Sequence, residues 1–487
     1  MGIRKRSTFE RLATGQFNRK ERRELARKLA AEDPGLEVVN RNVAGIDVGS
    51  ESHFVSVAPG LDSQAVREFG SWTADLEHMA DWLTACGVET VVMQSTGVYW
   101  IALYDVLEAR KFKVCLTNAR HTKNLPGRKS DVQESQWLMK LHTYGLLRDS
   151  FHPPDKIRAL RSLWRLRDRH VKDAGRTVQH MQKAMTAMNV QLSNAISDIS
   201  GATGQAIIRA IVNGERNPWT LAALRDRRIR ATKEEIARSL EGNWREDMLF
   251  ELKQAVAAYD FIQKQIEECD QRLQALLSAL PQRDITQADH QTQVTPDTVV
   301  LNRKRKRKKP RPDGNAPQFN MAVELERICG VDLTSIDGID IMTAQTILAE
   351  LGTDFSHWKT EAHFTSWLGL APSRDISGGK VVRQESRKVK NPVAAALRMA
   401  ASSLIRSESY LGARYRSLRT KLGAPKAIKA MARYLACLVY RMFINGRAWV
   451  DRGMRHFEQR RNERDLLLLQ RKASALGFQL VPESSNG

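Results

Sequence analysis

The 487-residue sequence lacks paired cysteines and long apolar runs, and each absence excludes a class of protein. None of the five cysteines stands in a CxxC pair and no histidine cluster accompanies them, so we expect no zinc site and a reduced, cytosolic setting. No apolar run approaches the ~18 residues of a membrane span, since the four leucines at 466–469 stand alone. The basic N-terminus also lacks the apolar core of a secretory signal.

Acidic residues are too few to balance the basic ones. The chain has 55 Asp and Glu against 77 Lys and Arg, which gives a formal net charge of +22. A surplus of this size favours a polyanionic partner, because phosphate contacts release bound counterions. The composition therefore predicts binding to nucleic acid, with a solvated basic surface as the alternative. The length allows two or three domains.

The distribution of apolar and charged residues predicts an α/β domain followed by mostly α-helical ones. From residue 43 short β-branched runs first form a hairpin series and then alternate with helices, as in the mixed sheet of a ribonuclease-H-like (RuvC-like) domain. The expected segments are a basic arm at 1–41, the RuvC-like domain at 42–150, a helical coiled-coil domain at 151–285, a basic linker at 286–318, a mostly helical C-terminal domain at 319–445 and a charged helical tail at 446–487.

A seven-residue repeat of apolar side chains marks the helical domain. Its main row is Trp164, Val171, Val178, Met185 and Leu192, and Arg167 interrupts the second row. This spacing predicts a coiled coil, which is either a dimerisation arm or an intramolecular helical hairpin.

Two helix starts are predicted from local signals. Thr73 is the expected N-cap of a helix that ends near Gly87. Thr232 and Glu235 have the spacing of a capping box, in which each side chain bonds the backbone N–H of the other residue.

Four oxygen-bearing side chains in the first third of the chain predict a metal site. Asp47 and Gln94 end short strands, while Asp131 and Glu134 lie three residues apart and so share one helix face. Cleavage of a phosphodiester by two Mg²⁺ ions needs carboxylates around the ions and open positions for phosphate and water. The alternatives are a solvated surface pair on the helix and simple hydrogen bonding by Gln94, whose amide brings no charge.

A second candidate site surrounds Ser377, which precedes two glycines in a predicted turn that exposes its hydroxyl. A serine hydroxyl is a poor nucleophile unless a base, a metal or a cation assists it. Residue types alone favour a plain turn here, and Ser373 and Ser386 are nearby rivals. Four basic side chains that follow could hold a phosphate: Lys380, Arg383, Arg387 and Lys388.

Further nucleic-acid contacts are expected at three places. Residues 333–352 are similar to a helix-hairpin-helix, with Gly338 in its turn and Asp340 in place of the second glycine, so this segment either binds a phosphate or serves packing. The basic run in the linker has no interleaved aromatics, so it predicts contact with a nucleic-acid backbone rather than with bases. The basic candidates are Arg303, Lys304, Arg305, Lys306 and Arg307 in that run, and Lys123, Arg128 and Lys129 before Asp131.

Three motifs carry a resemblance to a known family. VVMQSTGVYW, NARHTKNLPGRKSDVQESQWL and LGLAPSRDISGGK resemble signatures of the DEDD-type insertion-sequence transposases of the IS110 family, and the long helical insert and basic linker resemble its IS1111 branch. The resemblance covers roughly residues 40–445. It implies that Asp47, Gln94, Asp131 and Glu134 occupy the family's D, E, D and D positions, with Gln for Glu and Glu for Asp as departures. It also implies that Ser377 attacks DNA and forms a phosphoserine link.

The same resemblance implies the partners and the setting. These are Mg²⁺, DNA at the element ends and at the target, a noncoding guide RNA, and further copies of the chain in a homodimer or homotetramer. The expected location is the bacterial cytoplasm near the nucleoid, with no membrane association. Two other functions stay open. One is a Mg²⁺-dependent structure-specific endonuclease of the junction-resolvase type with no covalent step, and the other is a catalytically silent nucleic-acid-binding protein.

Overall fold

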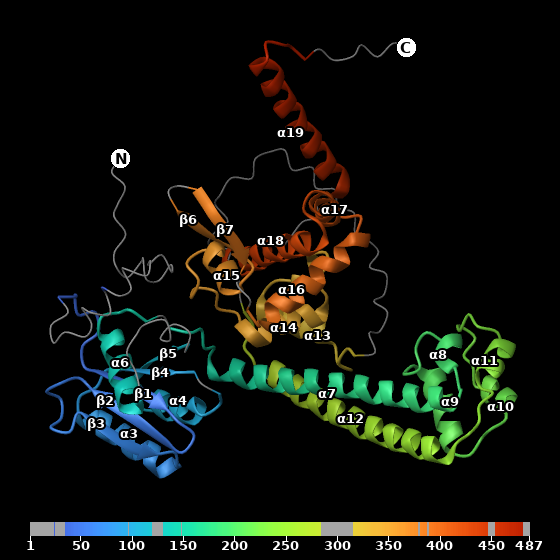
Figure 1. The fold of residues 1–487 in the computed structure, drawn as a ribbon, viewed down its shortest axis with the longest axis horizontal. Coiled ribbons are helices and arrows are strands. Elements are labelled where there is room, and N and C mark those ends of the chain that lie inside the picture. Colours follow the sequence, from blue (N-terminus) through green and yellow to red (C-terminus); the bar gives the residue numbers. More distant parts are fainter. Residues whose placement is uncertain are drawn as a thin grey trace. The chain divides into compact units, whose positions relative to one another are not determined.

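The computed structural model describes residue 24 and residues 35–95, 97–118, 130–147, 149–283, 315–377, 380–386, 389–446 and 453–480 (Figure 1). Contacts divide the chain into two units, Met1–His152 and Pro153–Gly487, and each is considered by itself. No helix among the described residues is long and apolar enough to cross a membrane.

The first unit contains a five-stranded mixed sheet with the order β3-β2-β1-β4-β5. β1 (Val43–Val48), β2 (Ser52–Val57) and β3 (Val66–Gly70) form an antiparallel meander. β4 (Thr90–Gln94) and β5 (Lys113–Thr117) run parallel to β1. The predicted mixed sheet, with a hairpin series followed by alternating strands and helices, is therefore confirmed.

Helices cover both faces of this sheet. α3 (Thr73–Ala85) and α4 (Trp100–Ala109) share one apolar cluster with the strands, to which Ile46 and Met93 contribute. α6 (Asp131–Thr143) packs on the opposite face, where Val92 meets its leucines. A Cβ atom added at Gly45 would overlap the backbone of α6 at Ser135 and Met139. Glycine at position 45 therefore allows α6 to lie close against β1.

The two predicted helix starts have different outcomes. The capping box of Thr232 and Glu235 is present at the start of α11 (Lys233–Ser239). The prediction for Thr73 is wrong, because the helix begins one residue earlier than expected. The Trp72 carbonyl already accepts hydrogen bonds from the N–H groups of Asp75 and Leu76, so Thr73 is the first helical residue and Trp72 the N-cap.

The second unit begins with a helical hairpin. α7 (Asp155–Ala187) packs along α12 (Glu246–Ser278), and both are 33 residues long. The four helices α8 (Leu192–Ala195), α9 (Ala202–Val212), α10 (Pro218–Ala223) and α11 lie between them in sequence and share one apolar core with them. Met185 and Leu192 of the seven-residue repeat lie in this core. The chain itself thus covers this end of the repeat, as the hairpin alternative predicts.

Arg167, which interrupts the repeat, is the largest fully buried side chain of the described residues. Its Nε donates to Asp270 Oδ1 at 2.5 Å, and its NH2 group donates to the Asn315 carbonyl at 2.8 Å. Arg167 is 2% exposed and Asp270 5% exposed. Arg167 therefore joins α7 to α12 and to Asn315, near the end of the segment predicted as the linker.

The rest of the second unit is mostly helical, as predicted, and its elements are given in chain order. They are α13 (Met321–Cys329), η2 (Leu333–Ser335), α14 (Ile341–Leu351), α15 (Glu361–Trp367), β6 (Pro372–Ser377), β7 (Lys380–Ser386), α16 (Pro392–Ser403), η3 (Leu404–Arg406), α17 (Tyr410–Leu422), α18 (Ala424–Asn445) and α19 (Gly453–Ala475). β6 and β7 form a two-stranded antiparallel hairpin. Phe355 stacks on Phe443 of α18 with ring centroids 4.3 Å apart, in the core of this region.

Candidate active site

The sheet brings Asp47 and Gln94 together. Ile46 and Met93 pair in the parallel ladder of β1 and β4, so the residues that follow them are neighbours at the strand ends. Ile46 and Met93 point into the α3 cluster, and side chains alternate between faces along a strand. Asp47 and Gln94 therefore face α6. Gln94 is 5% exposed, and Asp47 is half-buried.

α6 supplies the remaining two candidates from its first turn. The helix starts because Ser130 acts as its N-cap, with the hydroxyl accepting a hydrogen bond from the Gln133 N–H at 3.4 Å. Asp131 and Glu134 then lie where the partial positive charge of a helix N-terminus stabilises carboxylates. Asp131 is exposed and Glu134 is half-buried.

A hydrogen bond joins the strand end to the helix. The Gln94 side-chain amide donates from Nε2 to Glu134 Oε1 at 2.5 Å, across 40 residues of sequence. The structure thus brings Gln94 and Glu134 into contact, with Asp47 beside Gln94. Asp131 lies on the same helix, almost one turn before Glu134, and its carboxylate is open to solvent.

These donors match a hard divalent cation in chemistry. Carboxylate and amide oxygens are the protein ligands that Mg²⁺ and similar ions prefer. Within the part of the chain that the structure describes, no three His, Cys, Asp or Glu side chains are placed to hold a metal ion together. Of the four candidates, three are acids, and one of these, Asp131, is exposed. Asp47, Glu134 and Asp131 fit the ion as ligand types, with Gln94 orienting Glu134.

Thr117 is a candidate that the sequence did not reveal. It pairs with Gln94 across β4 and β5, and Cys115 two residues earlier lies in the α6 cluster, so Thr117 also faces α6. The residue is 0% exposed, and its Oγ1 has no hydrogen-bond partner among the described residues. A buried hydroxyl without a partner is uncommon and costs about 1–3 kcal/mol. In the sequence, the one indication of this role is that Thr117 lies near the end of its predicted strand, as Gln94 ends the preceding one.

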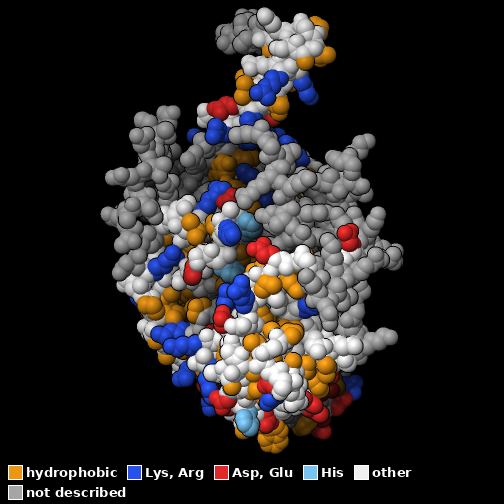
Figure 2. Space-filling view, turned by 90° about the vertical axis from the view of Figure 1, so that its left-hand side faces the viewer, with side chains coloured by type: hydrophobic (Ala, Val, Ile, Leu, Met, Phe, Trp, Pro, Cys, Tyr) orange, Lys and Arg blue, Asp and Glu red, His pale blue; other side chains and the backbone are white. Residues whose placement is uncertain are grey.

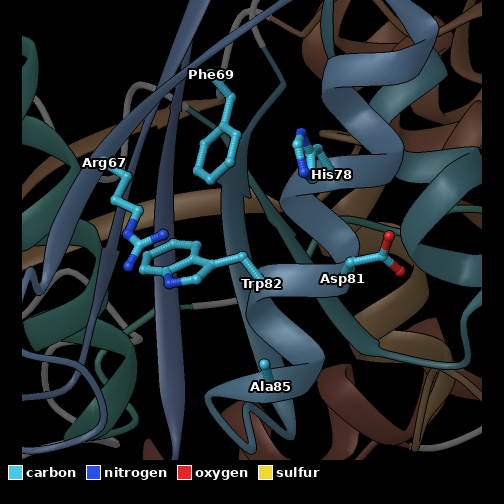
Figure 3. Close-up of a pocket in the computed structure, with 6 residues that line it drawn as sticks. All are labelled: Arg67, Phe69, His78, Asp81, Trp82 and Ala85. Carbon is cyan, nitrogen blue, oxygen red and sulfur yellow. The ribbon is translucent and has the colours of Figure 1, made fainter.

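A pocket of about 370 Å³ lies on the other face of the sheet (Figure 3). Arg67 and Phe69 of β3 line it together with Trp82 of α3, and Arg67 lies over the Trp82 ring at 4.8 Å. Asp81 is its one acidic wall residue, and it is paired with Arg110 at 2.7 Å. Because this pocket opens on the α3 face, it is separate from Asp47 and Gln94.

Asp62 holds the wall of this pocket in place. Its carboxylate accepts hydrogen bonds from the Trp82 indole N–H at 2.7 Å and from Arg67 at 2.8 Å. The bond from Trp82, the backbone bond from Gln64 and the charge of Arg67 lower the pKa of Asp62 to about 2. The pocket is thus built from side chains that satisfy one another.

The candidate serine lies at a hairpin end. Ser377 is the last residue of β6, and it pairs with Lys380, the first residue of β7. Arg383 lies in β7 opposite Asp375. Only the backbone of these residues is described. The rest of the basic candidates lie outside the described residues: Lys123, Arg128, Lys129, Arg303, Lys304, Arg305, Lys306, Arg307, Arg387 and Lys388.

Gly338 occupies a packed turn. Its φ of +89° is one that glycine adopts readily, and an added Cβ would lie 2.6 Å from the Ala400 carbonyl oxygen of α16. Asp340 caps α14 by accepting from the Thr343 N–H at 2.7 Å. Close packing against α16 supports the packing alternative for this segment.

Charge on the described surface is mixed. On the face drawn in Figure 2, Lys and Arg side chains are interspersed with acidic and hydrophobic ones. Several described arginines are already paired, including Arg110 with Asp81 and Arg209 with Asp260.

Two family models match the chain. The first, a transposase model of the DEDD IS110 type, matches residues 44–190, which include Asp47, Gln94, Asp131 and Glu134. The second, described as the transposase IS116/IS110/IS902 family, matches residues 332–416, which include Gly338 and Ser377. No curated protein matches the chain.

These findings define the chain as a DNA transposase, an enzyme that recombines DNA. Both matches support an IS110-family DEDD transposase, as the sequence resemblance predicted, and hence a protein of an insertion sequence. The transposase models imply DNA binding, and the DEDD domain indicates dependence on a divalent metal.

Proposed function

We propose that this transposase processes DNA at the strand ends of its ribonuclease-H-like sheet, with Asp47, Asp131 and Glu134 as ligands of Mg²⁺ and Gln94 completing the site. The contact between Gln94 Nε2 and Glu134 Oε1 carries the proposal, because it links the end of β4 to the first turn of α6. Bound Mg²⁺ would neutralise charge on the scissile phosphate. Gln94 would hold the Glu134 carboxylate in place, and Asp47 approaches from the neighbouring strand.

We infer that Ser377 is the nucleophile of the covalent step. Its hydroxyl oxygen forms a bond to the phosphorus while the bond from phosphorus to the leaving sugar oxygen breaks. The serine proton passes to solvent, and the leaving sugar oxygen takes up a proton. The phosphoserine keeps the energy of the phosphodiester, so rejoining needs no ATP. The position of Ser377 at the end of a hairpin, level with Lys380, supports this role, because a cation there stabilises phosphate charge.

We further propose that a noncoding guide RNA selects the DNA at the element ends and at the target. Basic residues without interleaved aromatics contact phosphates and carry little sequence information. The run at 303–307 and the residues at 123, 128 and 129 have this character, as do the four that follow Ser377. Base pairing by an RNA would then supply the specificity that such contacts lack.

A trapping experiment tests the covalent step. Wild-type protein is incubated with Mg²⁺ and DNA that carries the element ends, and adducts are separated on a denaturing gel. We expect Ser377→Ala to lose the protein–DNA adduct while it retains metal binding, and the matched variants Ser373→Ala and Ser386→Ala to keep the adduct. An adduct of undiminished yield with Ser377→Ala would contradict the assignment.

The same gel separates the two other functions. Nicking without an adduct in the wild-type protein would favour the junction-resolvase type of endonuclease. Complete absence of nicking would favour a catalytically silent nucleic-acid-binding protein. The neutral Gln94, at a position where the family has an acidic residue, is the observation that favours this alternative.

A further inference from the structure

Exposed apolar side chains gather beside the strand ends of the sheet. Val98, Tyr99 and Ile101 lie where the chain passes from β4 to α4, and they are 68%, 51% and 44% exposed. Scattered apolar residues are ordinary on a protein surface, whereas a contiguous exposed group commonly marks an interaction site. This group follows directly after Gln94, at the edge of the sheet that carries the candidate metal ligands.

The Tyr99 ring is held in place although it is exposed. Trp100, the next residue, packs with Tyr104 at a centroid distance of 5.9 Å and with His152 at 5.2 Å, which anchors the first turn of α4. Consecutive residues of a helix do not face the same side, so Tyr99 stays outside that aromatic cluster. Its ring lies beside Gly97, where an added Cβ atom would be 3.4 Å from two ring carbons. About half of Tyr99 remains open to a ligand.

The chain after β4 leaves the sheet close to the candidate site. The Ser95 N–H donates to the Thr117 carbonyl at 2.9 Å, so the ladder between β4 and β5 ends there. Asp47 lies at the same edge, at the end of β1. A DNA strand whose phosphate is held at Asp47 and Glu134 carries a base on either side of that phosphate. A base next to this phosphate is thus the DNA group best placed to meet Tyr99.

The residue types favour a nucleobase as the occupant. Every base has a flat π-face, and stacking on an aromatic side chain holds a base with little regard to sequence. Apolar side chains such as Val98 and Ile101 are of the type that proteins insert beside unstacked bases. A protein partner bound to this surface would cover the strand ends and obstruct the approach of DNA to the site. Because neighbours cover both faces of a base inside a duplex, a base on Tyr99 must be unstacked.

We propose that Tyr99 is a positioning residue for the DNA reaction. Its ring stacks on one unstacked base next to the phosphate at the metal site, with Val98 and Ile101 beside that base. The proposal rests on the proposed function, because it takes the phosphate to lie at Asp47 and Glu134. The stacked base would fix the strand relative to the metal ligands, and it would favour DNA that is already distorted at this step.

Trp72 provides a matched control at the same edge. It is 79% exposed and follows β3, whose last residue, Gly70, pairs with Ser52 of β2. The Gly49 N–H, just beyond β1, donates to the Ser52 carbonyl at 3.1 Å, so β3 and β1 end at the same level. Three strand spacings of ~4.8 Å separate β3 from β4, so their ends are ~14 Å apart. A base that lies on Tyr99 therefore cannot also stack on Trp72.

A cycle of protein and DNA changes tests the stack. Fluorescence anisotropy measures the affinity of the full-length protein for element-end DNA, with and without RNA transcribed from the element. Abasic sites are placed in turn at each position near the element end. We expect Tyr99→Leu to weaken binding ~10–100-fold, and loss of the base at one position to do the same. Together the two changes should cost no more than either alone, since both remove the same contact.

Two further variants separate the ring from its surroundings. Tyr99→Phe keeps the ring and should bind like the wild type. Trp72→Leu should still lose affinity when the base at the sensitive position is removed, because it leaves Tyr99 in place. Circular dichroism verifies that the helix content of Tyr99→Leu is unchanged, as expected for a half-exposed side chain.

Several outcomes would overturn the stack. These are unchanged binding by Tyr99→Leu, additive losses at every DNA position, and absence of DNA binding by the wild type. A loss in Tyr99→Phe as large as in Tyr99→Leu would assign the effect to the hydroxyl group, and equal coupling in Trp72→Leu would assign it to the edge in general. Both results contradict a stack on Tyr99.

Nicking of the same DNA is scored separately, so the two proposals fail in different ways. Coupling between Tyr99 and one base in a protein that does not nick DNA would contradict the proposed chemistry and leave the stack standing. Metal-dependent nicking without such coupling would contradict the stack alone.

Discussion

Two of the short polar contacts among the described residues, Arg167–Asp270 and Gln94–Glu134, differ in burial and in charge. Arg167 and Asp270 are both buried, carry opposite charges and share two hydrogen bonds. Gln94 is a buried neutral amide that donates to a half-buried carboxylate. The exposed Asp131 lies on α6 beside the second contact, and Thr117, whose hydroxyl has no partner among the described residues, lies on β5 opposite Gln94.

This difference distinguishes a contact that stabilises the fold from one that belongs to a functional site. A buried pair whose hydrogen bonds are made within the chain has little capacity left for a ligand. Polar groups that are left incompletely satisfied reduce stability, and proteins tolerate them mainly at functional sites. We therefore expect substitutions at Arg167 to act on folding, and substitutions around Gln94 to act on metal binding and DNA processing.

The largest effect is expected for Arg167→Met. The variant leaves Asp270 buried without its partner, which costs about 3–5 kcal/mol of unfolding free energy. The double variant Arg167→Met/Asp270→Leu should recover most of this loss, because no charge then remains buried. Urea denaturation followed by circular dichroism measures both.

Arg176→Met serves as the control on the same helix. Its ion pair with Asp173 is exposed, so its loss should change stability little. If Arg167→Met were as mild as this control, the buried pair would not hold the hairpin together.

A smaller effect, with a dependence on metal, is expected for Gln94→Glu. The substitution removes the hydrogen bond to Glu134 and places a second carboxylate beside it. When a chelator removes divalent metal, this should lower the unfolding free energy by roughly 1–3 kcal/mol. Mg²⁺ should restore stability, since a ligand that binds the folded state stabilises it. Thermal unfolding with EDTA and with Mg²⁺ measures the difference.

Gln133→Glu adds the same charge to an exposed position of α6 and is the matched control. Mg²⁺ should stabilise it no more than it stabilises the wild type. Equal responses of the two variants to Mg²⁺ would argue against a role for Gln94 in the metal site.

The smallest effect on stability is expected for Thr117→Val. Replacing a hydroxyl that has no partner should leave the unfolding free energy within about 1 kcal/mol of wild type, or raise it. Thr90→Val on the neighbouring strand should destabilise more, because Thr90 Oγ1 donates to the Lys113 carbonyl at 2.9 Å. If Thr117 contributes to the active site, Thr117→Val should retain wild-type stability and yet nick DNA more slowly, a combination that Thr90→Val should not show.

The sheet was predictable because its sequence signals are local. Short β-branched runs that end at Asp47 and at Gln94 predict strands directly, and parallel strands place such ends side by side. The contact of Gln94 with Glu134 was not predictable, because it depends on how closely α6 approaches the sheet. Gly45 permits that approach, and nothing in the pattern around Gly45 indicates which helix covers it.

The seven-residue repeat shows a second limit. Spacing predicts that Met185 and Leu192 are buried, but it does not state whether the partner helix belongs to the same chain. α12 and the short helices after α7 supply the partner here, and α12 carries a repeat of the same spacing, at Leu252, Tyr259, Ile266 and Leu273, that the prediction from sequence missed.

The most direct test of the central claim is Mg²⁺-dependent nicking of element-end DNA by Asp47→Asn. Asp47 faces α6 at the end of β1, whereas Asp81 lies on the other face of the same domain and is 59% exposed. We predict that Asp47→Asn loses nicking by at least a hundredfold and that Asp81→Asn retains it, as expected for loss of one charged metal ligand. Normal nicking by Asp47→Asn in Mg²⁺ would contradict the account.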